Sequence, residues 1–327
     1  MLRSGSVRPQ LPELPLEHWE PTKQTLHLWA QIVGKVRMAS SAPRNHWWHV
    51  PLYIDVRGLT TRRMHSASGI TFQIDFDFVD HRLVVKTGAG SVASFDLVDG
   101  LSVAAFDRAL HAELRELGID VPIREAPYGV PMTTPFPTDD EHASYDRDAV
   151  ERFWRILDWT DTVFVEFAGW YCGKTSPVHL FWHSLDLAVT RFSGRRTQAP
   201  PVHDRVDREA YSHEVVSFGF WAGDGHVREP NYYSYTAPEP PDMAQQPLRP
   251  EHARWMEQAI GSLALLTYDS VRRAVNPRAA LLSFLESAYR AGAREPGWNR
   301  EDLTSTWCPD PPMLSELLGE REVTARS

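Results

Sequence analysis

The stretch that decides the predicted architecture is TSPVHLFWHSLDLAVTRFSGRR, residues 175–196. It is the longest run of β-type sequence in the chain, and it also carries His179, His183, Asp186 and Arg191. We interpret the run as one long strand. Its polar side chains indicate either the wall of a pocket or a partly solvated sheet face.

One long strand would limit which of these side chains can act together. At roughly 3.3 Å per residue, His179 and His183 would lie about 13 Å apart, too far to hold one metal ion without a bulge. His179 and Arg191 would be about 40 Å apart, so only one end of a straight strand would belong to a site. The face that carries Asp186 and Thr190 is also typical of a solvated sheet surface.

The rest of the chain shows helical and strand periodicities on both sides of this run. Helices with recognisable caps or stops are predicted over Thr22–Met38, from Ser102 to Gly118, from Asp146 or Asp148 to Trp170, and from Asn276 to Gly292. Strands are predicted at Asn45–Val56, Ile70–Phe78, Arg82–Lys86, Val92–Leu97, Ile119–Ile123, Ser212–Trp221, Tyr232–Thr236 and Leu263–Thr267.

These elements divide the chain into two halves with the same order of helix, long strand, further antiparallel strands and helix. We place the halves at 19–123 and 147–292, a Pro-rich linker at 124–146, and extended arms at 1–18 and 296–327. His46-Trp47-Trp48-His49 in the first half resembles His179-Leu-Phe-Trp182-His183 in the second. The sequence therefore predicts an α+β fold of two packed halves and suggests an internal duplication.

Composition excludes several classes of function. The net charge of −9 over 327 residues argues against a nucleic-acid-binding surface, which needs a concentrated positive field. No apolar run approaches membrane-spanning length and no signal-like apolar core opens the chain, so we expect no membrane partner and a cytoplasmic location. Two cysteines, Cys172 and Cys308, cannot build a disulfide framework, and Cys172 ends an apolar helix where an inert thiol is expected.

One short motif suggests nucleotide binding, but its spacing and its surrounding sequence do not fit that function. Gly173-Lys174-Thr175-Ser176 matches the end of a phosphate-binding P-loop. Gly169 leaves only three intervening residues, however, and a helix precedes the motif where a strand is required. Pro177 then disfavours the helix whose N-terminus would hold the phosphate.

The aromatic content, 12 Trp, 10 Tyr and 14 Phe, is consistent with a large core and also with an aromatic-walled ligand cavity. We expect a small polar or anionic molecule between the two halves, held by Arg191 or Arg195, which can bind an anion through two hydrogen bonds. His179, His213 and Glu214 are candidate acid–base residues if the protein is an enzyme. The predicted ligand-binding residues are His46, Trp48, Trp182, Asp186, Arg191, Arg195 and Tyr211.

Two alternatives stay open. A metal-dependent enzyme would draw its ligands from several strands, such as His179, His213 and a carboxylate. A non-catalytic interaction module would use the aromatic strands as core and the Pro-rich loops as contacts. In the first case the histidines at the strand ends surround a concave cavity, and in the second they are dispersed. The cofactor and the oligomeric state are left open by the sequence.

Several motifs resemble one bacterial family, catalogued as a domain of unknown function, DUF5996. The matching pieces include Asn45-His-Trp-Trp, Phe76-Asp-Phe, His142-Ala-Ser-Tyr, Ser176-Pro-Val-His-Leu-Phe-Trp and Ala210-Tyr-Ser-His-Glu. The resemblance runs from about Trp19 to Trp298 and implies no particular activity. Because the family pattern has Gly at the position of His183 and allows replacement of His49, it leaves His46, His179 and His213 as the matching histidines.

Overall fold

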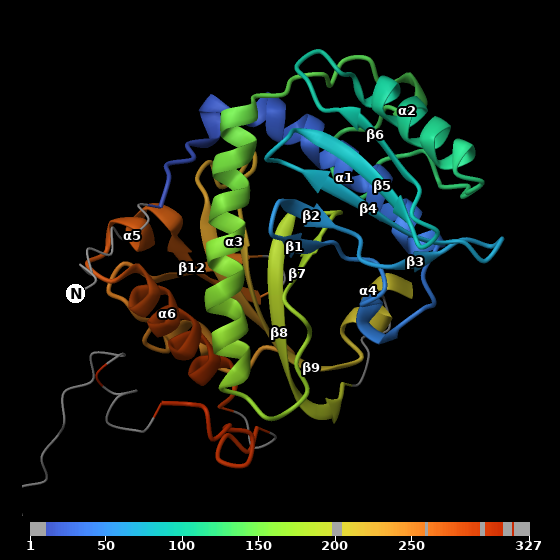
Figure 1. Cartoon of the computed structure of the whole chain (residues 1–327). Helices are drawn as coiled ribbons and strands as arrows, with labels where there is room; N and C mark the ends of the chain where they lie inside the picture. Colours follow the sequence, from blue (N-terminus) through green and yellow to red (C-terminus); the bar gives the residue numbers. More distant parts are fainter. Residues whose placement is uncertain (1–10, 198–204, 259–260, 295–297, 310–315, 317–327) are drawn as a thin grey trace, which may run out of the picture.

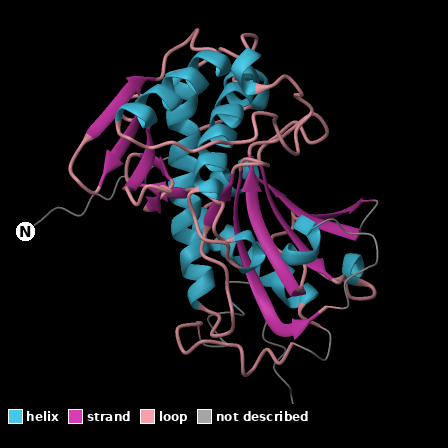
Figure 2. Ribbon diagram, turned by 90° about the vertical axis from the view of Figure 1, so that its right-hand side faces the viewer, coloured by secondary structure: helices cyan, strands magenta, loops and turns pink. Residues whose placement is uncertain are grey.

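The computed structural model describes residues 11–197, 205–258, 261–294, 298–309 and 316. In that part of the chain, antiparallel strands form two six-stranded sheets and the helices include six α-helices. Figure 2 shows two groups of strands on opposite sides of a central group of helices. The predicted α+β class is therefore confirmed, whereas the internal duplication stays a prediction.

The first sheet has the strand order β1-β2-β4-β5-β6, with β3 beside β4. Its strands are β1 (Tyr53–Asp55), β2 (Gly58–Thr60), β3 (Met64–His65), β4 (Thr71–Asp77), β5 (Arg82–Thr87) and β6 (Val92–Asp96). Strand β4 confirms the predicted alternation, because Phe72, Ile74 and Phe76 are buried. Two predicted strands are wrong. Residues 119–123 form none, and the run from Asn45 begins with a 3-10 turn, η2 (Asn45–Trp47), because two of its residues have a left-handed backbone.

The second sheet has the strand order β11-β12-β10-β9-β8-β7. Its strands are β7 (His179–Phe181), β8 (Asp186–Arg196), β9 (His213–Trp221), β10 (Asn231–Ala237), β11 (Arg254–Gln258) and β12 (Gly261–Thr267). Strands β9, β10 and β12 confirm the sequence prediction. Strand β11 was not predicted.

The run 175–196 is a hairpin, so the prediction of one long strand is wrong. Strand β7 ends at Phe181, the chain reverses over four residues, and β8 pairs antiparallel with β7, so that His179 lies opposite Ala188. Leu185 adopts a left-handed φ of 55° in the turn, and the Trp182 indole N–H donates to the carbonyl of Val50 at 3.0 Å. A turn made of these residue types carries no Gly, Pro or Asn signal, which explains why it was missed.

Backbone hydrogen bonds join the two sheets at one point. Leu52, just before β1, donates to the carbonyl of Leu180 at 2.9 Å and accepts from its N–H at 2.8 Å. Strands β1 and β7 are therefore neighbours, and the loop that contains η2 lies against the β7–β8 hairpin.

The helices are α1 (Glu20–Ala39), α2 (Val103–Glu116), α3 (Arg147–Gly169), α4 (Arg205–Ala210), α5 (Tyr268–Arg273) and α6 (Pro277–Gly292). The predicted N-caps are confirmed, because the side chains of Ser102, Asp146 and Asn276 accept from the backbone N–H three residues later. In Figure 1, α3 runs along most of the molecule, past the edge of the first sheet and alongside the second. It packs on β1, β8, α1 and α6, and therefore contacts a strand of each sheet.

The segment 124–146 packs against α1. Gln31 donates to the carbonyl of Tyr128 at 2.9 Å and accepts from its N–H at 2.8 Å, and Lys35 Nζ donates to the carbonyl of Ala126 at 2.7 Å. The segment also contains a 3-10 helix, η3 (Phe136–Thr138), and it ends at Asp146, the N-cap of α3.

Of the two predicted arms, residues 1–10, 296–297, 310–315 and 317–327 lie outside the described residues. Leu11, Leu14 and Leu16 are buried, the last in a 3-10 helix, η1 (Leu16–His18). The remaining 3-10 helix is η4 (Met243–Gln245). A search of the described residues finds no helix with the length and apolar character required for a membrane span.

Candidate functional site

A cavity of about 590 Å³ lies against one face of the second sheet. The sheet contributes residues of β7, β8, β9 and β10, while α1, the loop of η2, the segment around Tyr128, and α4 with the residue that follows it form the other walls. Its aromatic lining consists of Trp47, Trp48, Tyr128, Phe181, Trp182, Phe192, Tyr211, Tyr233 and Tyr235. Mostly apolar walls with a few convergent polar groups are typical of small-molecule sites.

Strand alternation explains which side chains reach the cavity. On β8, Asp186, Ala188, Thr190 and Phe192 line it, whereas the residues between them face the helices. Asp186 and Thr190 therefore lie on a cavity wall rather than on a solvated sheet face.

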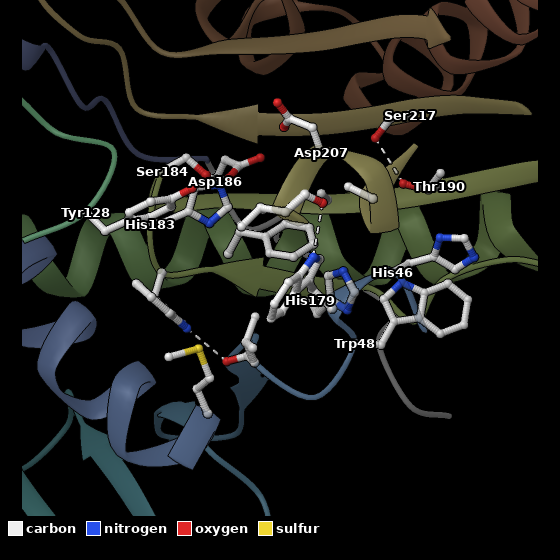
Figure 3. A pocket seen from close by; sticks show the side chains of 18 of the residues that line it. His46, Trp48, Tyr128, His179, His183, Ser184, Asp186, Thr190, Asp207 and Ser217 are labelled. Carbon is white, nitrogen blue, oxygen red and sulfur yellow. Dashed lines mark hydrogen bonds between the residues drawn. The ribbon is translucent and has the colours of Figure 1, made fainter. Parts of the chain in front are cut away.

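One end of the cavity is built around the Asp186 carboxylate. The hydroxyl of Ser184 donates to Oδ1 and the hydroxyl of Tyr233 donates to Oδ2. In Figure 3, Tyr128, His183 and Ser184 gather beside Asp186 at this end. Burial lowers the pKa of His183, and the Asp186 charge opposes that shift. Burial also raises the pKa of Tyr233 well above its usual value, so this hydroxyl keeps its proton and remains a donor.

The other end contains His46 and Trp48. The Nδ1 of His46 lies 3.2 Å from the Glu209 carbonyl, and Lys174 Nζ lies 2.5 Å from Nε2. This pattern fits a neutral ring that donates through Nδ1 and accepts at Nε2. Burial first, and then the charge of Lys174, lower the pKa of His46.

His213 belongs to the His46 cluster, but it does not line the cavity. Its ring centroid lies 5.4 Å from that of His46, in an edge-on arrangement. Burial and the nearby Lys174 charge lower its pKa. The predicted pairing of His179 with His213 is thus replaced by a pairing of His46 with His213.

His179 lies in the wall of the cavity and is almost fully buried, with 1% of its surface exposed. Burial, helped by the charges of Arg37 and Arg62, lowers its pKa to about 3. Its Nδ1 has no hydrogen-bond partner among the described residues. At neutral pH the ring is therefore uncharged, and it can contribute a hydrogen bond but no positive charge.

The two predicted anion-binding arginines do not line the cavity. Arg191 lies on the opposite face of the sheet, where it donates to the Phe167 carbonyl at 2.5 Å and sits 4.0 Å from the Glu286 carboxylate. Arg195 forms an ion pair with Glu214 at 2.8 Å. Glu214 also stays out of the cavity, because β9 turns only Val215 and Ser217 toward it.

Five of the predicted ligand-binding residues line the cavity, namely His46, Trp48, Trp182, Asp186 and Tyr211. That they bind a ligand stays a prediction. Within the described part of the chain, no group of three or more His, Cys, Asp or Glu side chains is arranged to hold a metal ion. The metal-dependent alternative therefore stays a prediction, and the described residues offer no set of ligands for a metal ion.

Sequence reasoning missed Lys35, Ser184, Tyr233 and Tyr235. The alternation in Asn231-Tyr232-Tyr233-Ser234-Tyr235 places Tyr233 and Tyr235 on one face of β10, and this was the available signal. Lys35 gave none, because α1 is buried on nearly every side. Burial lowers the pKa of Lys35 to about 8, so a fraction of it is neutral near physiological pH.

The fold and the cavity together define an α+β protein with an aromatic site built around one buried carboxylate. The chain belongs to the family described as "Family of unknown function (DUF5996)", whose model matches residues 11–305. This confirms the resemblance found in the sequence motifs. No curated protein and no solved structure matches the chain.

Proposed function

We propose that the protein binds a small organic molecule in the cavity, and that the ligand donates a hydrogen bond to Asp186 from an amine or hydroxyl group. The observation that supports this most directly is the Asp186 carboxylate, held by two hydroxyl donors inside an aromatic wall. Each carboxylate oxygen has two lone pairs, so a ligand can use the acceptor capacity that Ser184 and Tyr233 leave. The volume of about 590 Å³ also lies in the range of drug-sized sites.

The charges of the lining give no preference for an anionic ligand. Two acidic residues, Asp186 and Asp207, and two basic residues, Lys35 and Arg124, line the cavity together with its neutral and histidine side chains. There is no excess of positive charge, and the two arginines expected to hold an anion point elsewhere. A cationic amine would also gain from the aromatic faces around the carboxylate.

The position of the histidines supports ligand binding over a pure interaction module. His46, His179 and His183 line one concave cavity and are not dispersed over the surface.

A second candidate function is acid–base catalysis at the same site. It is favoured by the hydrogen bond between Tyr233 and Asp186, which joins a hydroxyl donor to a carboxylate base. In that case Asp186 accepts a proton from the substrate, and His179 or His183, both neutral, supplies hydrogen bonds. Retained ligand affinity with lost turnover in Asp186→Asn would favour this reading over simple binding.

Screening of an amine- and alcohol-rich fragment library by ligand-observed NMR tests the proposal. We expect binders to the wild type whose affinity falls about tenfold or more in Asp186→Asn, since a hydrogen bond to a charged group contributes about 1.5–3 kcal/mol. Asp96→Asn is the matched control, because Asp96 is an exposed carboxylate paired with Arg82 on β5. A library that yields only anionic binders, or binders indifferent to Asp186→Asn, would contradict the proposal.

A further inference from the structure

A second cavity, of about 680 Å³, opens beside the end of α1 and is separate from the carboxylate end of the first. Four arginines line it, Arg37, Arg44, Arg62 and Arg63, and no Asp or Glu does. Trp48 belongs to the walls of both cavities. We refer to this second cavity as the arginine pocket.

Four arginines without an acidic lining residue are unusual in this chain. It has 43 acidic and 34 basic residues, and its other arginines commonly pair with carboxylates, such as Arg57 with Asp77 at 2.7 Å and Arg228 with Glu20 at 2.6 Å. None of the four arginines of the pocket forms an ion pair with any described residue. In that part of the protein, no carboxylate lies within the 4.0 Å of an ion pair from any of them.

Two buried polar atoms in the pocket wall lack partners. Arg37 is only 7% exposed, and although it donates through one terminal nitrogen to the Thr61 carbonyl, its Nε has no partner among the described residues. The hydroxyl of Ser40, on a residue 8% exposed, is also unpartnered there. A buried donor without an acceptor costs about 1–3 kcal/mol, more when it is charged. The wall of the arginine pocket thus contains two buried donors for which the described residues supply no acceptor.

Backbone contacts and an aromatic ring position two of the four arginines, Arg37 and Arg62. The guanidinium of Arg62 stacks 3.5 Å from the centroid of the Tyr53 ring, and that of Arg37 lies 5.3 Å from it. Arg62 has a left-handed φ of 55°, an unfavourable conformation for a residue with a long side chain, and its N–H donates to Thr60 Oγ1 at 2.9 Å. Such strain is found where surrounding structure fixes a residue for a function.

The positive field of the cluster reaches beyond it. Burial is the largest cause of the lowered pKa of His179, and the charges of Arg37 and Arg62 lower it further. The charges of Arg37 and Arg44 likewise lower the pKa of His49. The field also acts on one carboxylate, that of Asp161. Burial raises the pKa of Asp161 to about 6, and the positive charge of Arg62 limits that rise. The carbonyl end of α1 adds about −0.5 charge, far less than four guanidinium groups.

We propose that the arginine pocket binds a small phosphate-bearing anion. Arginine guanidinium groups bind phosphate and carboxylate oxygens through paired hydrogen bonds. A phosphate monoester offers three acceptor oxygens and close to two negative charges, which matches several guanidinium groups and a serine hydroxyl better than one carboxylate does. The proposal does not depend on the function assigned to the aromatic cavity.

Isothermal titration calorimetry with inorganic phosphate and inorganic pyrophosphate tests the proposal on the full chain. Potassium chloride at matched ionic strength corrects for screening. We expect saturable binding to the wild type and a loss of about tenfold or more in affinity in the double variant Arg62→Gln/Arg63→Gln, which removes two charged donors. Both side chains are exposed, so the variant is expected to fold, and circular dichroism verifies this.

The control is Arg108→Gln, which removes an exposed arginine of α2 that lines neither cavity. It should leave phosphate affinity unchanged. Asp186→Asn should also leave phosphate affinity unchanged, so the fragment screen and the phosphate titration test the two cavities independently. Equal affinity in the double variant and the wild type, or heat only at the level of the chloride control, would overturn the proposal. Binding of succinate without binding of phosphate or pyrophosphate would also overturn it.

Discussion

The two faces of the second sheet share the same strands and have opposite surroundings. Toward α3 and α6, the sheet presents Leu187, Val189 and Phe218, each at most 1% exposed. Toward the aromatic cavity it presents Asp186, Ser217, and Tyr233 and Tyr235 of β10. Helices α3 and α6 pack directly on the first face, whereas the second face borders the cavity, whose other walls include α1 and α4.

A buried charged side chain lies on each face, Arg191 on one and Asp186 on the other, and the two have different surroundings. Arg191 is enclosed by the Phe167 carbonyl, the carboxylate of Glu286 and aromatic rings, so its role is structural. Asp186 is held by two hydroxyl groups but still borders an open volume. The difference is that packing encloses the charge on the face toward α3 and α6, whereas the charge on the other face borders a cavity.

The largest expected effect is on the helix-covered face. Phe218→Ala removes a ring that packs 5.0 Å from Phe167 in a fully buried position, and we expect it to lower the free energy of unfolding by about 3–5 kcal/mol. Urea denaturation measures this. Tyr235→Phe on the cavity face is the comparison and should change the same quantity by less than about 1.5 kcal/mol. Similar losses in both variants would mean that the two faces contribute equally to stability.

Gly219→Ala tests whether the cavity face depends on a close approach. A Cβ on Gly219 would overlap the ring of Tyr233, which lies across from it in the β9–β10 register. We expect a loss of about 1–3 kcal/mol in stability and weaker binding of any ligand that uses Asp186, because Tyr233 must move. Gly225→Ala, where a Cβ meets open space, is the control. Unchanged fragment binding in Gly219→Ala would show that the Tyr233 contact is dispensable.

Acid should destabilise the fold through His179, which lines the aromatic cavity. The pKa of His179 is about 3 in the folded chain against 6.5 for the free side chain, so below pH 6.5 the unfolded chain binds more protons. Stability is unaffected above pH 6.5 and falls as the pH drops toward 3, by up to about 1.4 kcal/mol per pH unit from this group. His179→Gln should flatten that dependence in urea melts at pH 7, 6 and 5, whereas His226→Asn, an exposed control, should not. A slope unaltered by His179→Gln would assign the acid effect to other groups, such as His27, whose pKa burial also lowers to about 3.

The smallest effect is expected for a single polar contact on the cavity face. Thr190→Val removes the hydrogen bond between Thr190 Oγ1 and Ser217 Oγ, 3.0 Å apart, and should cost about 0.5–1.5 kcal/mol. The double variant Thr190→Val/Ser217→Ala is expected to recover part of this, because no hydroxyl is then left unpaired. Thermal melts of the three proteins give the comparison. A loss as large as that of Phe218→Ala would mean that the cavity face is as tightly packed as the helix face.

Local patterns predicted a large part of the fold. The caps at Ser102, Asp146 and Asn276 and the alternation in β4 act over a few residues, so they are visible without tertiary contacts. The reversal at Trp182–Leu185 was not visible, because Trp182 is anchored to Val50, more than a hundred residues earlier. Its indole also fits against Gly34, where a Cβ would overlap the ring.

The sequence by itself determined the α+β class, most helix and strand positions, and six of the side chains that line the aromatic cavity, because periodicity and capping are local properties. The tertiary structure alone decided how these residues combine. It placed Arg191 under the helices, moved His213 to His46, brought Tyr233 to Asp186, and gathered four arginines from α1 and two later loops into one pocket. Such groupings depend on which residues distant in the chain become neighbours, and a local pattern does not specify those neighbours.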